Sequence, residues 1–240
     1  MSIRLKAVLF DFNGVIINDE PIHEELLEQL LLEENLRMGP KDFQTYCLGR
    51  SDRACIRDLM AQRGRTLTEA ELDKLIQRKA RAYADKLGTM DKLPIYPGLE
   101  DFIFKLRATP VKLAVVSGAL RSEVEVVLSR INLLNVFDTI VAGDDITVSK
   151  PEPDGYLLAV QRLQNQFPAL GVTPANCLAI EDTFAGIEAA KRATIPVVGI
   201  AHSYPFHMMQ RVANWAVDYF SDLEFERIGL VADASSSEPA

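Results

Sequence analysis

The sequence predicts an α/β fold in which a doubly wound parallel sheet is interrupted near its start by a helical insert. Short apolar runs suited to buried strands alternate with amphipathic stretches of helical period along most of the chain. Such alternation favours parallel strands joined by right-handed crossovers, with helices on both faces of the sheet. One interval, from about Asn18 to Leu93, shows only helical pattern and indicates the insert.

The first strand is predicted at Ala7–Phe10, where four apolar residues follow a lysine. The other predicted strands are Leu113–Val116, Thr139–Ala142, Leu178–Ile180, Val197–Ile200 and Trp215–Tyr219. The amphipathic stretches between them predict helices at Leu99–Arg107, Ser122–Ile131, Pro153–Asn165 and Phe184–Ala193. We therefore expect residues 1–17 and 94–231 to form one Rossmann-like core.

The insert is predicted to hold three helices, at Pro21–Glu34, Arg53–Arg63 and Glu69–Lys86. The first has leucine or isoleucine at positions 22, 26, 27, 30 and 31, which is the spacing of one buried helical face. A cluster of helix breakers at Leu93–Gly98 marks the return to the core. We expect residues 18–93 to form a helical cap, and residues 232–240, rich in Ser, Glu and Pro, to form a disordered tail.

Composition limits the possible partners and the location. The 240 residues carry a net charge of −8, which argues against nucleic acid or an anionic membrane as a partner. No run reaches transmembrane length, and the N-terminus enters a strand directly instead of forming a signal peptide. Cys47, Cys55 and Cys177 are odd in number and lack metal-ligand spacing, so we expect reduced thiols in a cytoplasmic protein.

Polar side chains follow the predicted strands where each one ends. The first strand leads to Asp11, the second to Ser117-Gly118, the third to Gly143-Asp144-Asp145 and then Lys150, and the fourth to Glu181-Asp182. Ligands bind outside the carboxyl ends of the strands in open parallel sheets. A carboxylate at such a position is costly unless a cation or a chemical role compensates for it.

This set of side chains indicates phosphoryl transfer. Carboxylates at two strand ends suit Mg²⁺, which prefers oxygen ligands and retains water for substrate phosphate. Asp11 could act as a nucleophile that forms an aspartyl-phosphate. Ser117 could donate to a phosphoryl oxygen, and Lys150 could neutralise the charge that develops in transfer.

Four motifs, in order, resemble those of the haloacid-dehalogenase superfamily, in its branch of phosphatases and β-phosphoglucomutases with a helical cap. They are Asp11-Phe-Asn13-Gly14-Val15, Val116-Ser117-Gly118, Ser149-Lys150-Pro151 and Ile180-Glu181-Asp182-Thr-Phe-Ala-Gly186-Ile187. The resemblance extends from about Lys6 to Asp222 and includes the cap. It implies the hydrolysis of a phosphomonoester through an aspartyl-phosphate intermediate, with Mg²⁺ as the cofactor.

The resemblance also implies roles for individual residues. Asp11 is expected to be the nucleophile and a metal ligand, and Asp182 to complete the protein ligands, with Glu181 beside it or acting through water. The backbone carbonyl of Asn13 is expected to ligate the ion. Ser117 and Lys150 are expected to hold the phosphoryl group, with Gly14 and Gly118 close to the substrate.

Four cap residues are candidates for substrate binding. His23 aligns with a histidine that couples substrate binding to cap closure in the mutases, although it could equally be a solvated residue in a first helical turn. Lys79 matches a cap lysine that reaches toward the active site, or is one more surface charge. Arg50 and Arg53 flank Asp52, which falls where the mutases carry a phosphate-gripping arginine.

Asn13 is the main departure from the family pattern, because that position usually holds an aspartate that transfers protons. The favoured function is a phosphatase for a small cytosolic phosphometabolite, and the family implies a monomer. A phosphosugar mutase is the second hypothesis. A catalytically reduced protein that binds phosphorylated ligands is the third.

Overall fold

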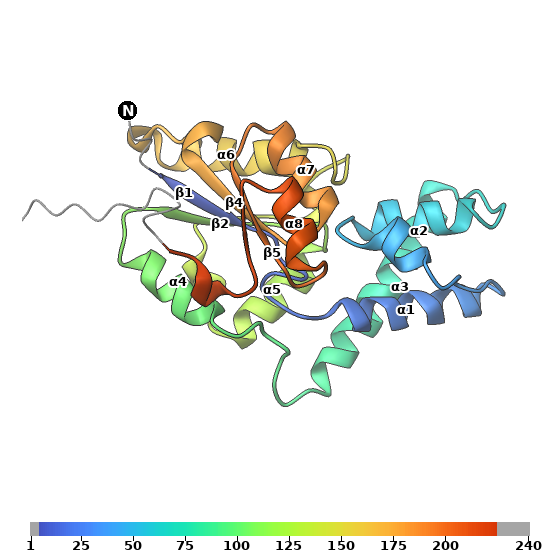
Figure 1. The fold of residues 1–240 in the computed structure, drawn as a ribbon. Helices are drawn as coiled ribbons and strands as arrows, with labels where there is room; N and C mark the ends of the chain where they lie inside the picture. Colours follow the sequence, from blue (N-terminus) through green and yellow to red (C-terminus); the bar gives the residue numbers. More distant parts are fainter. Residues whose placement is uncertain (1–4, 225–240) are drawn as a thin grey trace, which may run out of the picture.

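The computed structural model describes residues 5–224 and contains a sheet of six parallel strands in the order β3-β2-β1-β4-β5-β6 (Figure 1). The strands are β1 (Ala7–Phe10), β2 (Lys112–Val116), β3 (Thr139–Val141), β4 (Cys177–Glu181), β5 (Val197–Ile200) and β6 (Trp215–Val217). β1 is central, and the chain builds the sheet outward from it in both directions. The predicted doubly wound α/β fold is therefore confirmed, with strand ends that differ from the predicted ones by one or two residues.

Alternating residues of β1 face two separate apolar cores. Val8 and Phe10 pack with α4 (Leu99–Arg107) and α5 (Arg121–Arg130) on one face of the sheet. Ala7 and Leu9 pack on the other face, against the helices α6 (Asp154–Gln166), α7 (Phe184–Arg192) and α8 (Phe206–Val212). Because both faces are covered, the central strands are apolar throughout, which is why they read as continuous hydrophobic runs.

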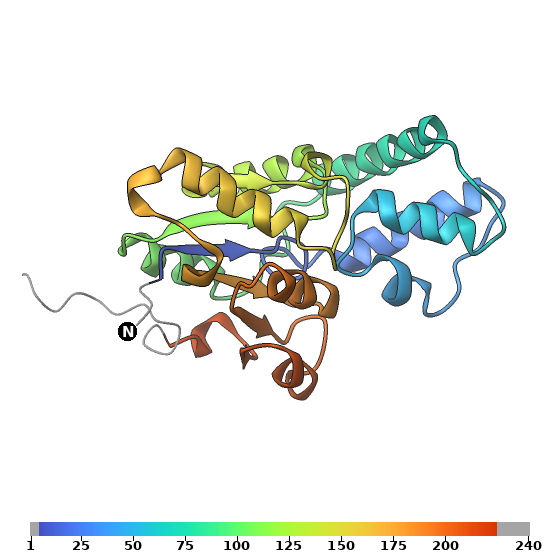
Figure 2. The ribbon, with the colours of Figure 1, turned by 90° about the horizontal axis from the view of Figure 1, so that it is seen from above.

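The helical insert forms a third apolar cluster of its own. It contains α1 (Glu20–Glu33), the π-helix η1 (Phe43–Cys47), α2 (Asp52–Ala61) and α3 (Glu69–Gly88). α3 begins at Thr68, whose hydroxyl and the Glu71 carboxylate form a capping box. In Figure 2 the arrowhead of β1 points toward these helices, so the insert lies beyond the carboxyl ends of the strands.

The domain boundaries given above stay a prediction, and the tail expected at 232–240 lies outside the described residues. The sequence analysis did not predict η1 or α8, which are too short to show a clear helical period. Short 3-10 turns complete the described elements: Leu134–Val136, Gly143–Asp145, Pro168–Leu170, Pro174–Asn176 and Phe220–Asp222. Within residues 5–224, no helix has the length and apolar character needed to cross a bilayer.

The expectation of three reduced thiols is wrong, because Cys47 and Cys55 form a disulfide. Cys47 is the last residue of η1, and Cys55 lies in the first turn of α2. Packing of these two helices brings the Cα atoms to 4.6 Å, within the usual range for a disulfide. A separation of eight residues in the sequence could not reveal that proximity. Cys177 is free and buried in β4.

Candidate active site

Three buried carboxylates meet where β1 and β4 end. Phe10 of β1 pairs with Ile180 of β4, so the residues that follow them in the chain are neighbours across the sheet. Asp11, Glu181 and Asp182 each offer a ligand oxygen, and these oxygens lie within 4.8 Å of one another. Parallel pairing of two central strands therefore assembles the acidic cluster predicted from the sequence.

Lys150 provides the positive charge beside this cluster. Its Nζ lies 2.7 Å from Asp11 Oδ1 and 2.7 Å from Glu181 Oε1, and it donates to the carbonyl oxygen of Val116 at 3.2 Å. The Tyr156 hydroxyl donates to the same Glu181 oxygen at 2.5 Å. Burial alone would lower the pKa of Lys150, but Asp11 and Glu181 outweigh burial and hold that pKa above its ordinary value. The ammonium group therefore stays charged.

One lysine does not balance three buried carboxylates. Burial, and then the Asp11 charge, raise the pKa of Glu181 to about 7 despite Lys150. Burial, followed by the charges of Glu20 and Asp11, raises the pKa of Asp182 well above its ordinary value. Asp182 Oδ1 is buried without a hydrogen-bond partner, while Oδ2 accepts a hydrogen bond from Ser203. An orphaned carboxylate oxygen in an all-oxygen donor set fits a hard divalent cation at this position.

Gly14 allows the loop that follows β1 to approach Asp182. Its φ is +77°, and a Cβ there would lie 1.9 Å from Asp182 Oδ2 and 2.6 Å from Glu20 Oε1. Only glycine combines that backbone conformation with that space. Burial, and then the Asp19 charge, raise the pKa of Glu20 to about 8, so a fourth acidic group crowds the cluster from the start of α1.

Ser117 and Gly118 follow β2 and face the insert. Ser117 is buried, and its Oγ accepts a hydrogen bond from the Ala119 amide at 3.0 Å. A Cβ on Gly118 would lie 2.9 Å from the Ser51 amide nitrogen and 3.0 Å from the Arg50 carbonyl carbon. Gly118 therefore serves close packing between the sheet and the insert, in addition to the substrate contact that the resemblance implies.

Asn13 lies in a largely buried polar network that joins the loop after β1 to α1 and α3. Its Nδ2 donates to Asp19 Oδ1 at 2.9 Å and Oδ2 at 3.0 Å. His23 Nε2 lies 3.2 Å from Asp19 Oδ2, and the His23 ring stacks on Tyr83 with centroids 4.7 Å apart. Tyr83 donates its hydroxyl to Asp19 as well. The solvated alternative for His23 is therefore wrong.

The charges in this network support one another. Burial acts to raise the pKa of Asp19, but His23 and the donated hydrogen bonds lower that pKa below its ordinary value. Burial and Lys79 act to lower the pKa of His23, yet Asp19 outweighs them and holds it above its ordinary value. The structure thus places the Asp19 carboxylate beside the His23 ring, next to Asn13.

A small cavity lies between the sheet edge and the insert. Asp11, Asn13 and Gly118 line its sheet side, and Glu20 and His23 of α1 line its flank. The lining from the insert includes Leu27, Phe43, Cys47, Leu48, Gly49, Arg50, Asp52 and Cys55. The cavity thus offers carboxylates at one end and a largely apolar wall at the other.

The candidate cap cations are all engaged by acidic side chains. Arg50 Nη1 lies 2.7 Å from Asp58 Oδ2. Arg53 pairs with Glu69 and Asp73 on α3.

Lys79 is buried, 2.6 Å from Asp52 Oδ2 and 3.7 Å from Glu123 Oε1, so the surface alternative for it is wrong. Of the three cations, only Arg50 is among the residues that line the cavity.

Sequence reasoning missed several residues that the fold brings to this site. Glu20 opens α1 directly after Asp19, and this pair of acidic residues was a usable signal. Tyr156 and Ser203 lie far along the chain in segments without a motif, so only the tertiary structure could place them beside Glu181 and Asp182.

Residues 5–194 match a family model described as haloacid dehalogenase-like hydrolase. A phosphorylated carbohydrates phosphatase of Thermotoga maritima is 29% identical over 201 residues, covering 83% of this chain and 87% of that protein. A β-phosphoglucomutase of Bacillus subtilis is 28% identical over 224 residues, covering 92% of this chain and 93% of that protein. The crystal structure of β-phosphoglucomutase from Clostridium difficile has a TM-score of 0.81 at 23% identity, covering 93% and 95% of the two chains. The structural likeness shows the shared fold.

Proposed function

Because the chain belongs to the haloacid dehalogenase-like hydrolases, we propose that it is a Mg²⁺-dependent phosphatase of small phosphomonoesters that works through an aspartyl-phosphate on Asp11. The observation that carries the proposal is the buried cluster of Asp11, Glu181 and Asp182 beside a single lysine. Phosphoryl transfer needs a nucleophile, charge neutralisation and an ion on the phosphoryl oxygens. This cluster offers the first two and the ligands that would hold the ion. The proposal includes a cytoplasmic location and a monomeric state.

Each residue has a distinct part in the proposed reaction. Asp11 Oδ attacks phosphorus and the leaving oxygen departs in line; water then attacks the phosphoryl group and frees the carboxylate. Lys150, held by Glu181, neutralises charge on the transferring group. The Ser117 Oγ accepts from the Ala119 amide, so its hydrogen can point to a phosphoryl oxygen. Mg²⁺ bound by Asp11, Asp182 and the Asn13 carbonyl would supply further charge stabilisation.

The pairing of the cap cations favours a phosphatase over a sugar-bisphosphate mutase. A mutase must grip a second phosphate, whereas Arg50, Arg53 and Lys79 each lie against a carboxylate of the insert. Freeing Lys79 or Arg50 would leave a mostly buried Asp52 or a half-buried Asp58 unpaired, whereas the carboxylates that pair with Arg53 are exposed. The apolar lining opposite Asp11 suits an uncharged leaving group better than a second phosphate.

Asn13 favours slow turnover, and it is the reason to retain a phospho-ligand-binding protein as the second candidate. An amide can donate a hydrogen bond to the leaving oxygen but cannot exchange a proton with it. Positioned acid–base catalysis is worth about 10²–10⁴ in rate. Enzymes can accelerate the hydrolysis of phosphate monoesters by about 10²¹. Losing the acid–base contribution alone would therefore leave measurable turnover.

A panel of phosphomonoesters assayed for phosphate release with and without Mg²⁺ tests the proposal. We expect Mg²⁺-dependent release that Asp11→Asn abolishes. Calorimetry with a phosphate analogue should show that Asp182→Ala weakens Mg²⁺ binding severely, while the exposed control Asp218→Ala leaves it unchanged. If Asp182→Ala binds Mg²⁺ as tightly as the parent, the assignment of Asp182 as a metal ligand is wrong. An inactive parent that still binds phosphorylated ligands would favour the binding-protein alternative.

A further inference from the structure

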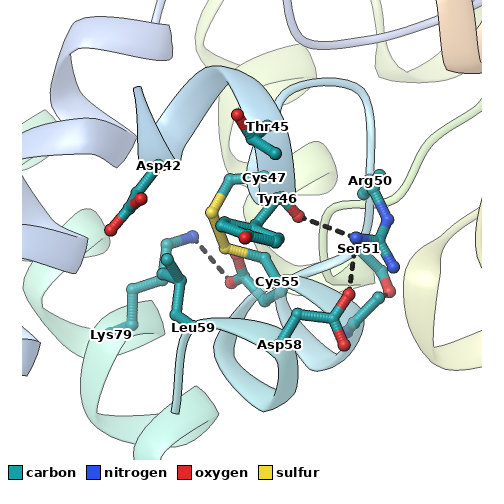
Figure 3. The surroundings of a disulfide bond; sticks show 12 residues. Asp42, Thr45, Tyr46, Cys47, Arg50, Ser51, Cys55, Asp58, Leu59 and Lys79 are labelled. Atoms are coloured by element: carbon teal, nitrogen blue, oxygen red, sulfur yellow. Dashed lines mark hydrogen bonds and ion pairs between the residues drawn. A yellow bond between two sulfur atoms is a disulfide. The ribbon is translucent and has the colours of Figure 1, made fainter. Parts of the chain in front are cut away.

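The Cys47–Cys55 disulfide lies in the wall of the active-site cavity. Both cysteines line that cavity together with Asp11 and Asn13. Both are buried, so the cavity is the side from which a reagent can approach the sulfur atoms. Figure 3 shows the bond joining the end of η1 to the start of α2, with Arg50 on the loop between them.

The disulfide closes a ring over residues 48–54, called loop 48–54 below, of which 52–54 form the first turn of α2. This loop carries close contacts between the insert and the sheet edge. A Cβ on Gly49 would lie 2.4 Å from Thr183 Oγ1, directly after Asp182. The Ser51 amide donates to Ser149 Oγ at 2.8 Å, directly before Lys150. Gly118 also lies close to this loop, against the backbone of Arg50 and Ser51. The loop therefore rests on the three segments that supply Ser117, Lys150 and Asp182.

Noncovalent bonds also hold the loop, among them the ion pairs of Asp52 and Arg53 described above. Arg50 Nη1 donates to the Tyr46 carbonyl oxygen at 3.0 Å and to Asp58 Oδ2 at 2.7 Å, which joins η1 to α2 (Figure 3). Ser51 Oγ accepts from the Ala54 amide at 3.4 Å and caps α2. Arg50 Nε is buried without a hydrogen-bond partner. With the disulfide open, these bonds would keep the helices folded while the loop gains freedom.

We propose that Cys47 and Cys55 form a reversible redox site that controls how firmly loop 48–54 seats on the sheet edge and thereby sets substrate affinity. In the oxidised state the loop is preorganised and the apolar wall is complete. In the reduced state two separate thiols replace the bond, and the loop must be ordered again when substrate binds. The site thus couples thiol redox state to the leaving-group side of the cavity.

The chemical step is thiol–disulfide exchange with a dithiol. One thiolate of the dithiol attacks a protein sulfur and releases the other as a thiolate. The second thiolate of the dithiol then closes its own disulfide and releases the first protein sulfur. Two electrons and two protons pass to Cys47 and Cys55, and the dithiol becomes a cyclic disulfide. The reverse exchange, with an oxidised dithiol, restores the bond. Disulfides in cytosolic proteins are usually transient and either redox-sensing or catalytic, which fits such a cycle at the proposed location.

Cys177 provides the internal control. It is buried in the apolar core beneath β4, and burial raises the pKa of its thiol to about 12. Such a thiol is a poor nucleophile, so exchange should be confined to the cavity pair. Alkylation of the denatured protein should therefore count one free thiol after oxidation and three after reduction.

Amide hydrogen exchange tests the structural part of the proposal without any need for activity. Treatment with dithiothreitol should speed exchange of the amides in 48–54, the Ser51 amide above all, and leave those of β4 unchanged. Cys55→Ser should exchange as fast as the reduced parent in the presence or absence of the dithiol. Cys177→Ser should switch as the parent does. Equal exchange in the oxidised and reduced parent would overturn the proposal.

The kinetic part rests on the proposed phosphatase function. We expect reduction to raise KM for the best substrate about three- to tenfold, the cost of ordering one mobile side chain on binding. kcat should change less than KM, because the nucleophile and Lys150 lie on the sheet. Cys55→Ser should show the raised KM in either condition. If reduction changes amide exchange in the loop but leaves KM unchanged, the proposed control of substrate affinity is wrong. If no substrate is turned over in either redox state, that result counts against the phosphatase function alone.

Discussion

Replacing Asn13 with aspartate should speed turnover by at least about tenfold, a floor taken from the 10²–10⁴ range of positioned acid–base catalysis. The reason lies in the geometry around the side chain. Asn13 lines the cavity and is held by Asp19, so a carboxyl group in its place would face the leaving oxygen. Unlike the amide, it could give up a proton and take one back.

The protonation state of the new carboxyl group follows from its distance to Asp19. The Asn13 Nδ2 atom is 2.9 Å from Asp19 Oδ1. Two unit negative charges at that spacing repel by about 5–6 kcal/mol at an effective dielectric constant of about 20, equivalent to roughly four pKa units. The pair would therefore retain one proton at neutral pH, as carboxylate dyads do. Since His23 and Tyr83 stabilise the charge on Asp19, the proton should lie on the new group, ready for the leaving oxygen.

Steady-state kinetics on the best phosphomonoester from the panel measures the effect, with Mg²⁺ affinity followed by calorimetry. Mg²⁺ affinity should stay close to that of the parent, because the backbone carbonyl at this position is kept. The double variant Asn13→Asp with Asp19→Asn is the matched control. It keeps a carboxyl group at position 13 without a charged neighbour, so that group should ionise at lower pH. Its gain in kcat should therefore be lost on the alkaline side at a lower pH than in the single variant.

A flat kcat in Asn13→Asp, with folding and Mg²⁺ affinity intact and with Asp11→Asn inactive, would refute the reasoning. It would mean that another group already transfers the proton. A gain in the double variant but none in the single one would show that repulsion from Asp19 misplaces the carboxyl group.

Two further predictions concern the acidic cluster. The metal-free protein should lose stability as the pH rises from about 5 to 8. The pKa of Glu20 is raised to about 8 in the native state, whereas the unfolded chain releases this proton near pH 4.5. Between these two pH values the native state binds a proton that the unfolded state does not, so rising pH favours unfolding. Urea unfolding across that range should show a smaller loss for Glu20→Gln, and an equal slope in both proteins would contradict the assignment. Gly14→Ala should destabilise the fold and weaken Mg²⁺ binding, because a Cβ would meet Asp182 Oδ2 at a φ of +77°. Thermal melts should show a smaller loss for the control Gly64→Ala, which has a φ of +73° but nothing within 4 Å of a Cβ, so its cost is about 1–2 kcal/mol of backbone strain.

Much of the site could be predicted because its residues follow directly from strand ends. Asp11 and Glu181 end neighbouring parallel strands, and once a parallel sheet is predicted their proximity follows. The roles implied for them by the resemblance stay predictions until the variants are assayed. The cap was harder to predict, because helical period gives the buried face of each helix but not the partner of any one charge.

The linear sequence determined the α/β order, the helical insert and the acidic edge, because hydrophobic period and strand-end polarity are local properties of the chain. Tertiary packing alone decided that Cys47 meets Cys55, that Lys79 is buried against Asp52, and that Asn13 is held by Asp19 beside His23. Disulfides, buried ion pairs and hydrogen-bond networks depend on distances of a few ångströms between side chains. Such distances are fixed only when helices pack on helices and the insert seats on the sheet.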